Sequence, residues 1–156
     1  MKLWLLFVLG TVLCWGAYVP TLHHGQHAFA GKGGAALRAF LFVGVAYFIV
    51  SVAVLAYLLA ARAEPLELTG RGILLSTLAG IFGAIGALGI VFAIKHGGSP
   101  LLVAPLVFAG APIMNTFVSM IWDKPGRMPD WRFFLGILLA GVGAALALRF
   151  KPPAAS

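Results

Sequence analysis

The stretch GILLSTLAGIFGAIGALGIVFAI, residues 72–94, contains 23 residues and no charged side chain. At about 1.5 Å per residue, a helix of this length crosses a hydrocarbon core of about 30 Å. Because no charged residue interrupts the stretch, it is expected to span a lipid bilayer as a helix.

Four further apolar runs flank this stretch and are also long enough to cross a bilayer: residues 3–20, 37–61, 101–122 and 131–148. Of the 156 residues, 62% are hydrophobic and 10% are charged, which leaves too few polar side chains to cover a soluble domain. We therefore expect an all-α integral membrane protein, a bundle of five transmembrane helices. Residues 1–150 form its single domain and residues 151–156 a short polar tail.

The positive charge of the chain lies at the ends of these runs, where Lys and Arg anchor helices at lipid headgroups. A formal net charge of +7 would suggest nucleic-acid binding in a soluble protein, but here the charges lie at helix ends. We therefore expect no nucleic-acid partner. One face of the bilayer would carry six positive residues and the other five: Lys2, Arg62, Arg71, Lys124, Arg127 and Arg132 against Lys32, Arg38, Lys95, Arg149 and Lys151. This balance weakly favours an internal N-terminus and permits insertion in both orientations.

The loops and the N-terminus add three expectations. The first run is too long and too far from the small residues Ala28 and Ala30 for a typical cleaved signal peptide. The single cysteine, Cys14, cannot form an intrachain disulfide. The segment KHGGSP, residues 95–100, predicts a short connection in which glycines end one helix and Pro100 begins the next.

Glycine recurs at every third position of the third run, at Gly80, Gly83, Gly86 and Gly89. In a bilayer, small residues let helix backbones approach each other closely. The row predicts either close packing against a fixed neighbour or a surface that slides or lines a solute path during transport.

The fourth run contains both a backbone break and polar side chains. Gly110 and Pro112 predict a kink, since proline cannot donate the helical hydrogen bond. Asn115, Thr116 and Ser119 follow, and an asparagine at this depth needs a partner in protein, water or solute. These three residues are candidates for solute binding, and interhelical hydrogen bonding is the alternative.

Aromatic and histidine side chains follow at the end of the first run. Trp15 and Tyr18 are expected either in an aromatic belt at the membrane interface or in the wall of a solute pocket. The expected loop from residue 21 to about residue 36 contains His23, His24 and His27. No carboxylate or cysteine lies near these histidines, so we predict no metal site and leave a pH-sensitive headgroup contact open.

Asp and Glu are absent from all five apolar runs. Export of cationic drugs coupled to protons usually relies on a membrane-embedded carboxylate, so a neutral or weakly anionic solute fits the sequence better. The runs also contain no nucleophile with a base, no metal-ligand cluster and no phosphate-binding loop. We therefore expect neither an enzyme nor a cofactor.

Several segments together resemble one EamA-type repeat of the drug/metabolite transporter superfamily. They are WGAYVP at 15–20, Arg38 at the start of the second run, residues 86–113 and GILLAGVGAALAL at 136–148. In that family the five-helix unit usually occurs twice, as inverted halves of a ten-helix solute carrier. The first motif is more similar to the sugar-uptake branch than to the drug branch.

The chain departs from the family pattern at two points. A Gly-Glu pair often follows the fourth helix in the family, whereas this sequence reads Trp122-Asp123-Lys124. Only one repeat is present, so a transporter built from this chain would need a second copy or a homologous half.

Together these features predict a half-size transporter in the bacterial inner membrane that moves a small neutral or weakly anionic metabolite as a dimer by alternating access. The alternative is a membrane subunit that does not transport and instead stabilises a larger complex through its glycine-rich face. A polar cavity that reaches Asn115 would favour transport, and a solidly packed bundle there would favour the subunit.

Overall fold

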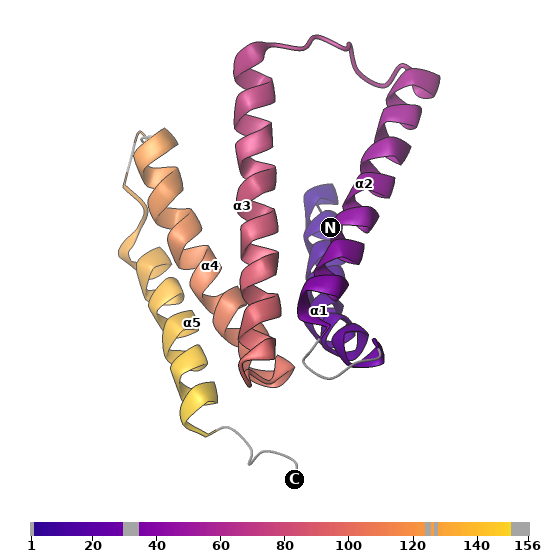
Figure 1. Cartoon of the computed structure of the whole chain (residues 1–156). Coiled ribbons are helices and arrows are strands. Elements are labelled where there is room, and N and C mark those ends of the chain that lie inside the picture. Colours follow the sequence, from indigo (N-terminus) through magenta and orange to yellow (C-terminus); the bar gives the residue numbers. More distant parts are fainter. Residues whose placement is uncertain (1, 30–34, 124–125, 127, 151–156) are drawn as a thin grey trace. The chain divides into compact units, whose positions relative to one another are not determined.

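The computed structural model describes residues 2–29, 35–123, 126 and 128–150. Within these ranges the chain forms five helices, shown in Figure 1: α1 (Leu3–Ala28), α2 (Ala36–Ala61), α3 (Gly70–Lys95), α4 (Pro100–Asp123) and α5 (Trp131–Arg149). The expected tail at 151–156 and the charged residues Lys32, Lys124, Arg127 and Lys151 lie outside the described residues.

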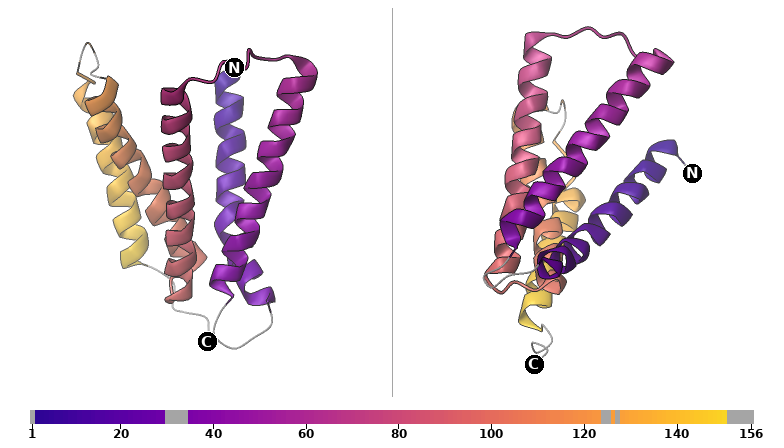
Figure 2. Two further views of the ribbon diagram at one scale, coloured as in Figure 1. Left: turned by 45° about the horizontal axis from the view of Figure 1, so that its top comes forward. Right: turned by 45° about the vertical axis from the view of Figure 1, so that its right-hand side comes forward.

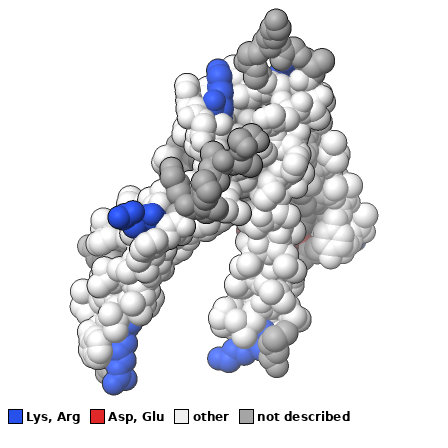
Figure 3. Space-filling view, turned by 90° about the horizontal axis from the view of Figure 1, so that it is seen from below, with Lys and Arg blue, Asp and Glu red and all other residues white. Residues whose placement is uncertain are grey.

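All five helices are long and apolar enough to cross a membrane. Their large apolar side chains point outward; Phe48 of α2 and Phe82 of α3, for example, are 69% and 72% exposed. The space-filling view in Figure 3 shows extensive helix surface without acidic or basic residues, with Lys and Arg at isolated places. Such a surface is stable only in contact with lipid, so the chain is an integral multi-pass membrane protein.

The chain divides into two compact units, of which the first combines Met1–Val19 with Gly98–Ser156. This unit holds most of α1 together with α4 and α5. Helices α4 and α5 pack side by side and run in opposite directions, as Figures 1 and 2 show. The short segment between them keeps the two helices adjacent in space.

The second unit is Pro20–Gly97 and contains the last turns of α1 with α2 and α3. Helices α2 and α3 contact each other near the start of α2 and the end of α3, and they separate toward the 62–69 loop (Figure 1). The buried residues gather at the contacting end: Leu22, Gln26, Ala35, Ala36, Ala39, Ile90, Val91 and Ile94. Small residues of α2 therefore face larger aliphatic residues of α3.

Helix α1 is longer than the sequence predicts, and the expected loop from residue 21 was wrong. The helix continues through Pro20 to Ala28, so all three histidines lie on it. A proline inside a helix removes one backbone hydrogen bond, but its fixed φ is compatible with helix, and Leu22, Gln26 and Ala28 favour helix beyond it. The other four helices begin and end within two residues of their expected bounds.

Helix α4 runs without interruption across Gly110 and Pro112. Because Pro112 has no N–H, the carbonyl of Phe108 cannot accept the usual helical bond from it. The connection before α4 matches the expectation: α3 ends at Lys95, Gly97 adopts a positive φ of 93° that suits glycine, and Pro100 is the first residue of α4.

Asp130 caps α5, and its Oδ1 accepts a hydrogen bond of 2.8 Å from the backbone N–H of Arg132. Replacing Asp130 with alanine should lower the free energy of unfolding by about 1 kcal/mol, since the N–H loses its acceptor. Unfolding in mixed micelles, followed by circular dichroism, measures this change.

Asp130→Asn should keep the stability of the parent, because asparagine caps equally well. Asp123→Ala is the matched control, since it removes a carboxylate at the other end of the same connection. An equal loss in Asp130→Ala and Asp123→Ala would show that charge, and not capping, determines the effect.

Candidate functional site

The three polar residues predicted on α4 share one pocket of about 270 Å³. Its wall is completed by the end of α4, by the segment before α5 and by the first turn of α5. The lining residues are Asn115, Thr116, Ser119, Met120, Asp123, Pro129 and Phe133. We call this the α4–α5 pocket.

Helical geometry explains why α4 contributes five residues to this pocket. At about 100° per residue, positions 115, 116, 119, 120 and 123 fall within an arc of about 140° on one side of the helix. Asp123 is four residues after Ser119, so its carboxylate follows the polar face of α4 directly. Phe133 of α5 brings an aromatic ring to the same pocket.

The hydrogen bonds of the pocket residues differ. The hydroxyl of Thr116 donates to the carbonyl of Pro112 at 2.9 Å, so its proton is used within the helix. Within the described part of the chain, the side chains of Asn115, Ser119 and Asp123 have no hydrogen-bond partner. The pocket therefore offers an amide, a hydroxyl and a carboxylate to a bound molecule or to water.

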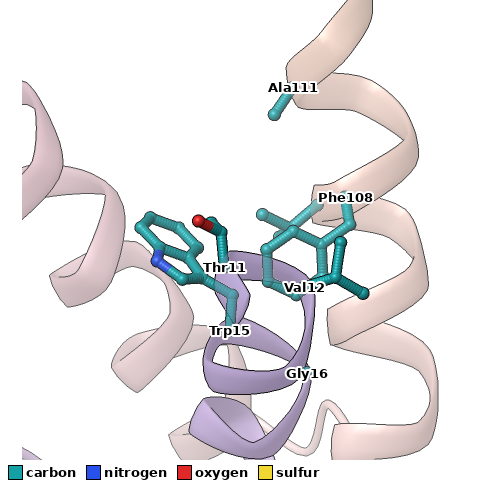
Figure 4. Close-up of a pocket in the computed structure, with 7 residues that line it drawn as sticks. Thr11, Val12, Trp15, Gly16, Phe108 and Ala111 are labelled. Atoms are coloured by element: carbon teal, nitrogen blue, oxygen red, sulfur yellow. The ribbon is translucent and has the colours of Figure 1, made fainter. Parts of the chain in front are cut away.

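Trp15 lies in a different pocket, of about 520 Å³, between α1 and α4. We call this the α1–α4 pocket; Figure 4 shows it with its lining residues, which are Thr11, Val12, Trp15, Gly16, Val107, Phe108 and Ala111. The rings of Trp15 and Phe108 meet edge to face, with centroids 5.9 Å apart. Carbon atoms form almost the whole wall.

The predicted solute-binding residues therefore do not form one site. Asn115, Thr116 and Ser119 come together, whereas Trp15 lines the other pocket. Tyr18 is half-buried and lines neither of these two pockets.

The histidines form a cluster on the last turns of α1. The rings of His23 and His27 have centroids 4.4 Å apart, and those of His23 and His24 are 5.8 Å apart. Nδ1 of His27 donates to the carbonyl of His23 at 2.9 Å, which fixes its proton on that nitrogen. Among the described residues, no group of three or more His, Cys, Asp or Glu side chains could hold a metal ion.

The glycine row of α3 faces open space. A Cβ added at Gly80, Gly83, Gly86 or Gly89 would meet no described atom within 4 Å outside the local helix backbone. The close packing partner that the row predicts is therefore not found among the described residues of this chain's own second unit.

Sequence reasoning did not predict four of the seven lining residues of the α4–α5 pocket as site residues: Met120, Asp123, Pro129 and Phe133. The spacing of Asn115, Ser119 and Asp123 at intervals of four was a usable signal for the carboxylate. It also missed Gln26, which is 8% exposed and whose Nε2 has no hydrogen-bond partner in the described ranges. Gln26 was expected in a loop, where burial of an amide was not considered.

Comparison of the chain with protein-family models, with curated proteins and with solved structures gave no match. The candidate site therefore depends on the pocket's own residues and geometry.

The α4–α5 pocket should admit water, which a thiol-labelling experiment measures. In a Cys14→Ala background, Ser119→Cys should react with a charged thiol reagent about ten-fold faster than Ile121→Cys, because only a hydrated thiolate reacts. Ile121 is the matched control: it is 75% exposed on the same helix but does not line the pocket. Equal rates would show that exposure on α4, and not the pocket, admits the reagent.

Proposed function

We propose that the chain is a half-size membrane transporter of the EamA type that works as a dimer in a bacterial inner membrane. It moves a small polar metabolite by alternating access, with the α4–α5 pocket as the solute site. The resemblance of residues 15–20, 86–113 and 136–148 to an EamA-type repeat supports the class of function.

The observation that carries the proposal is that Asn115, Thr116 and Ser119 line one pocket together with Asp123. Polar side chains in a membrane helix are costly unless they are paired or face water, and those that persist mark solute and ion pathways. If Asn115 and Ser119 acted only as hydrogen-bonding contacts between helices, they would bond to a neighbouring helix. Within the described residues neither side chain does so.

Asp123 narrows the class of solute. The sequence suggested a neutral or weakly anionic metabolite, but a carboxylate in the wall is a hydrogen-bond acceptor and disfavours an anion beside it. Asn115 and Ser119 both donate and accept. A neutral solute with several hydroxyl or amide donors therefore fits the pocket better than an anionic one.

Uptake into proteoliposomes tests the solute site, with a panel of sugars, amino acids and nucleotides as substrates. Asn115→Ala and Asp123→Asn should each reduce the flux of the transported solute roughly ten-fold, the effect of one lost hydrogen bond of about 1.4 kcal/mol. Asp130→Asn is the control, because it removes a carboxylate near the same connection and retains the cap of α5.

Unchanged flux in Asn115→Ala and Asp123→Asn would remove the α4–α5 pocket as the solute site. If the parent transported no solute of the panel, the result would favour the alternative function, a membrane subunit that does not transport. The exposed glycine row of α3 is the surface that favours this second function.

The proposed dimer would use the glycine row. Gly83→Leu combined with Gly86→Leu should lower the dimer fraction about ten-fold in lipid, because the added side chains hold two helices apart. Chemical crosslinking over a range of protein-to-lipid ratios measures this fraction. Gly44→Leu on α2 is the control, since its Cβ position is equally open within the chain. Only monomer in the parent at every density would refute the dimer.

A further inference from the structure

The α1–α4 pocket lies at the depth of the lipid hydrocarbon. Along the helix axis, Trp15 is about 1 Å from the middle of α1 and Phe108 about 5 Å from the middle of α4. The hydrocarbon core extends about 15 Å to each side of the bilayer centre. A molecule that enters the pocket sideways therefore comes from the acyl-chain region, and headgroups remain outside.

The chemistry of the wall disfavours a polar occupant. Thr11 is the one hydroxyl residue of the lining, and its Oγ1 already donates to the carbonyl of Phe7 at 2.9 Å. The lining contains no charged side chain. Apart from the indole N–H of Trp15, the lining side chains offer no free donor, so a polar solute would lose most of its hydrogen bonds to water, at about 2–7 kcal/mol for each group left without a partner.

The shape of the pocket suits a hydrocarbon chain that enters from the side. Val12 and Trp15 line it and are 61% and 48% exposed, so the pocket opens on the outer surface of the helices. Gly16 and Ala111 leave space between the larger side chains, and a Cβ at Gly16 would meet nothing within 4 Å. The edge-to-face rings of Trp15 and Phe108 form one wall (Figure 4).

Because the pocket lies at hydrocarbon depth, has an apolar wall and opens sideways, we propose that the α1–α4 pocket binds the acyl chain of a bilayer phospholipid. The acyl chain would lie in this open groove of about 520 Å³ and gain dispersion contacts with the two rings. This lipid site is separate from the α4–α5 pocket and does not depend on the proposed transport.

Fluorescence quenching in vesicles tests the site with phosphatidylcholine brominated in the middle of its acyl chains. The full chain carries Trp4→Phe, Trp122→Phe and Trp131→Phe, so that Trp15 is its only tryptophan and is excited selectively over the tyrosines. Gly16→Leu fills the pocket and should reduce quenching of Trp15 about two-fold, because the leucine replaces the bromine-bearing chain at the ring.

Gly10→Leu is the matched control, since Gly10 lies on the same helix, has an equally open Cβ position and does not line the pocket. Quenching of Trp15 in Gly10→Leu should equal that in the parent with the single tryptophan. Native mass spectrometry gives a second readout: phospholipid retained by the purified parent and by Gly10→Leu should be lost from Gly16→Leu.

Three results would overturn the proposal. Equal quenching and equal lipid retention in Gly16→Leu and Gly10→Leu would show ordinary contact with surrounding lipid. Loss of quenching as the protein density in the vesicles rises would identify a second copy of the chain as the occupant. Loss of quenching on addition of a transported solute would identify that solute instead.

Discussion

Every backbone N–H and C=O group inside a bilayer must find its hydrogen-bond partner within the protein, because hydrocarbon offers none. An α-helix meets this requirement within a single segment, and all five long apolar runs of this chain are helical. The same requirement explains why α1 and α4 continue through internal prolines: the helix loses single bonds there, whereas ending it would expose several groups. Outward-facing phenylalanine and leucine side chains then follow from contact with lipid.

Helix α4 has two kinds of surface along its length. Its first half contributes Val107, Phe108 and Ala111 to an apolar pocket, and its second half contributes the polar side chains of Asn115, Ser119 and Asp123 to the other. The change occurs across Pro112, between Ala111 and Asn115, within about one turn of helix. A lipid contact and a hydrated contact can therefore coexist on one helix, each matched to its own neighbour, α1 or α5.

The sequence was sufficient for the number of helices and for most of their ends, since both depend on local composition, on caps and on glycine or proline. The end of α1 was missed because the apolar run ends at Pro20, whereas the helix continues into the polar segment with His23, His24 and His27. The residues that line the two pockets could be predicted from the sequence only in part. Spacing places Asn115, Thr116 and Ser119 on one face of α4, but no periodicity shows that Phe133 meets that face or that Trp15 meets Phe108. Those pairings depend on how separate helices pack.

The hydroxyl groups within the membrane-spanning helices have a consequence for biogenesis. Thr11, Ser51 and Thr116 each donate to the carbonyl four residues earlier on their own helix. Since these hydroxyl groups need no partner from another segment, they add little polar cost when their helices enter the bilayer during synthesis. Asn115 has no such internal partner within the described chain, so the insertion of α4 benefits from help by the insertion machinery or by a helix already in place.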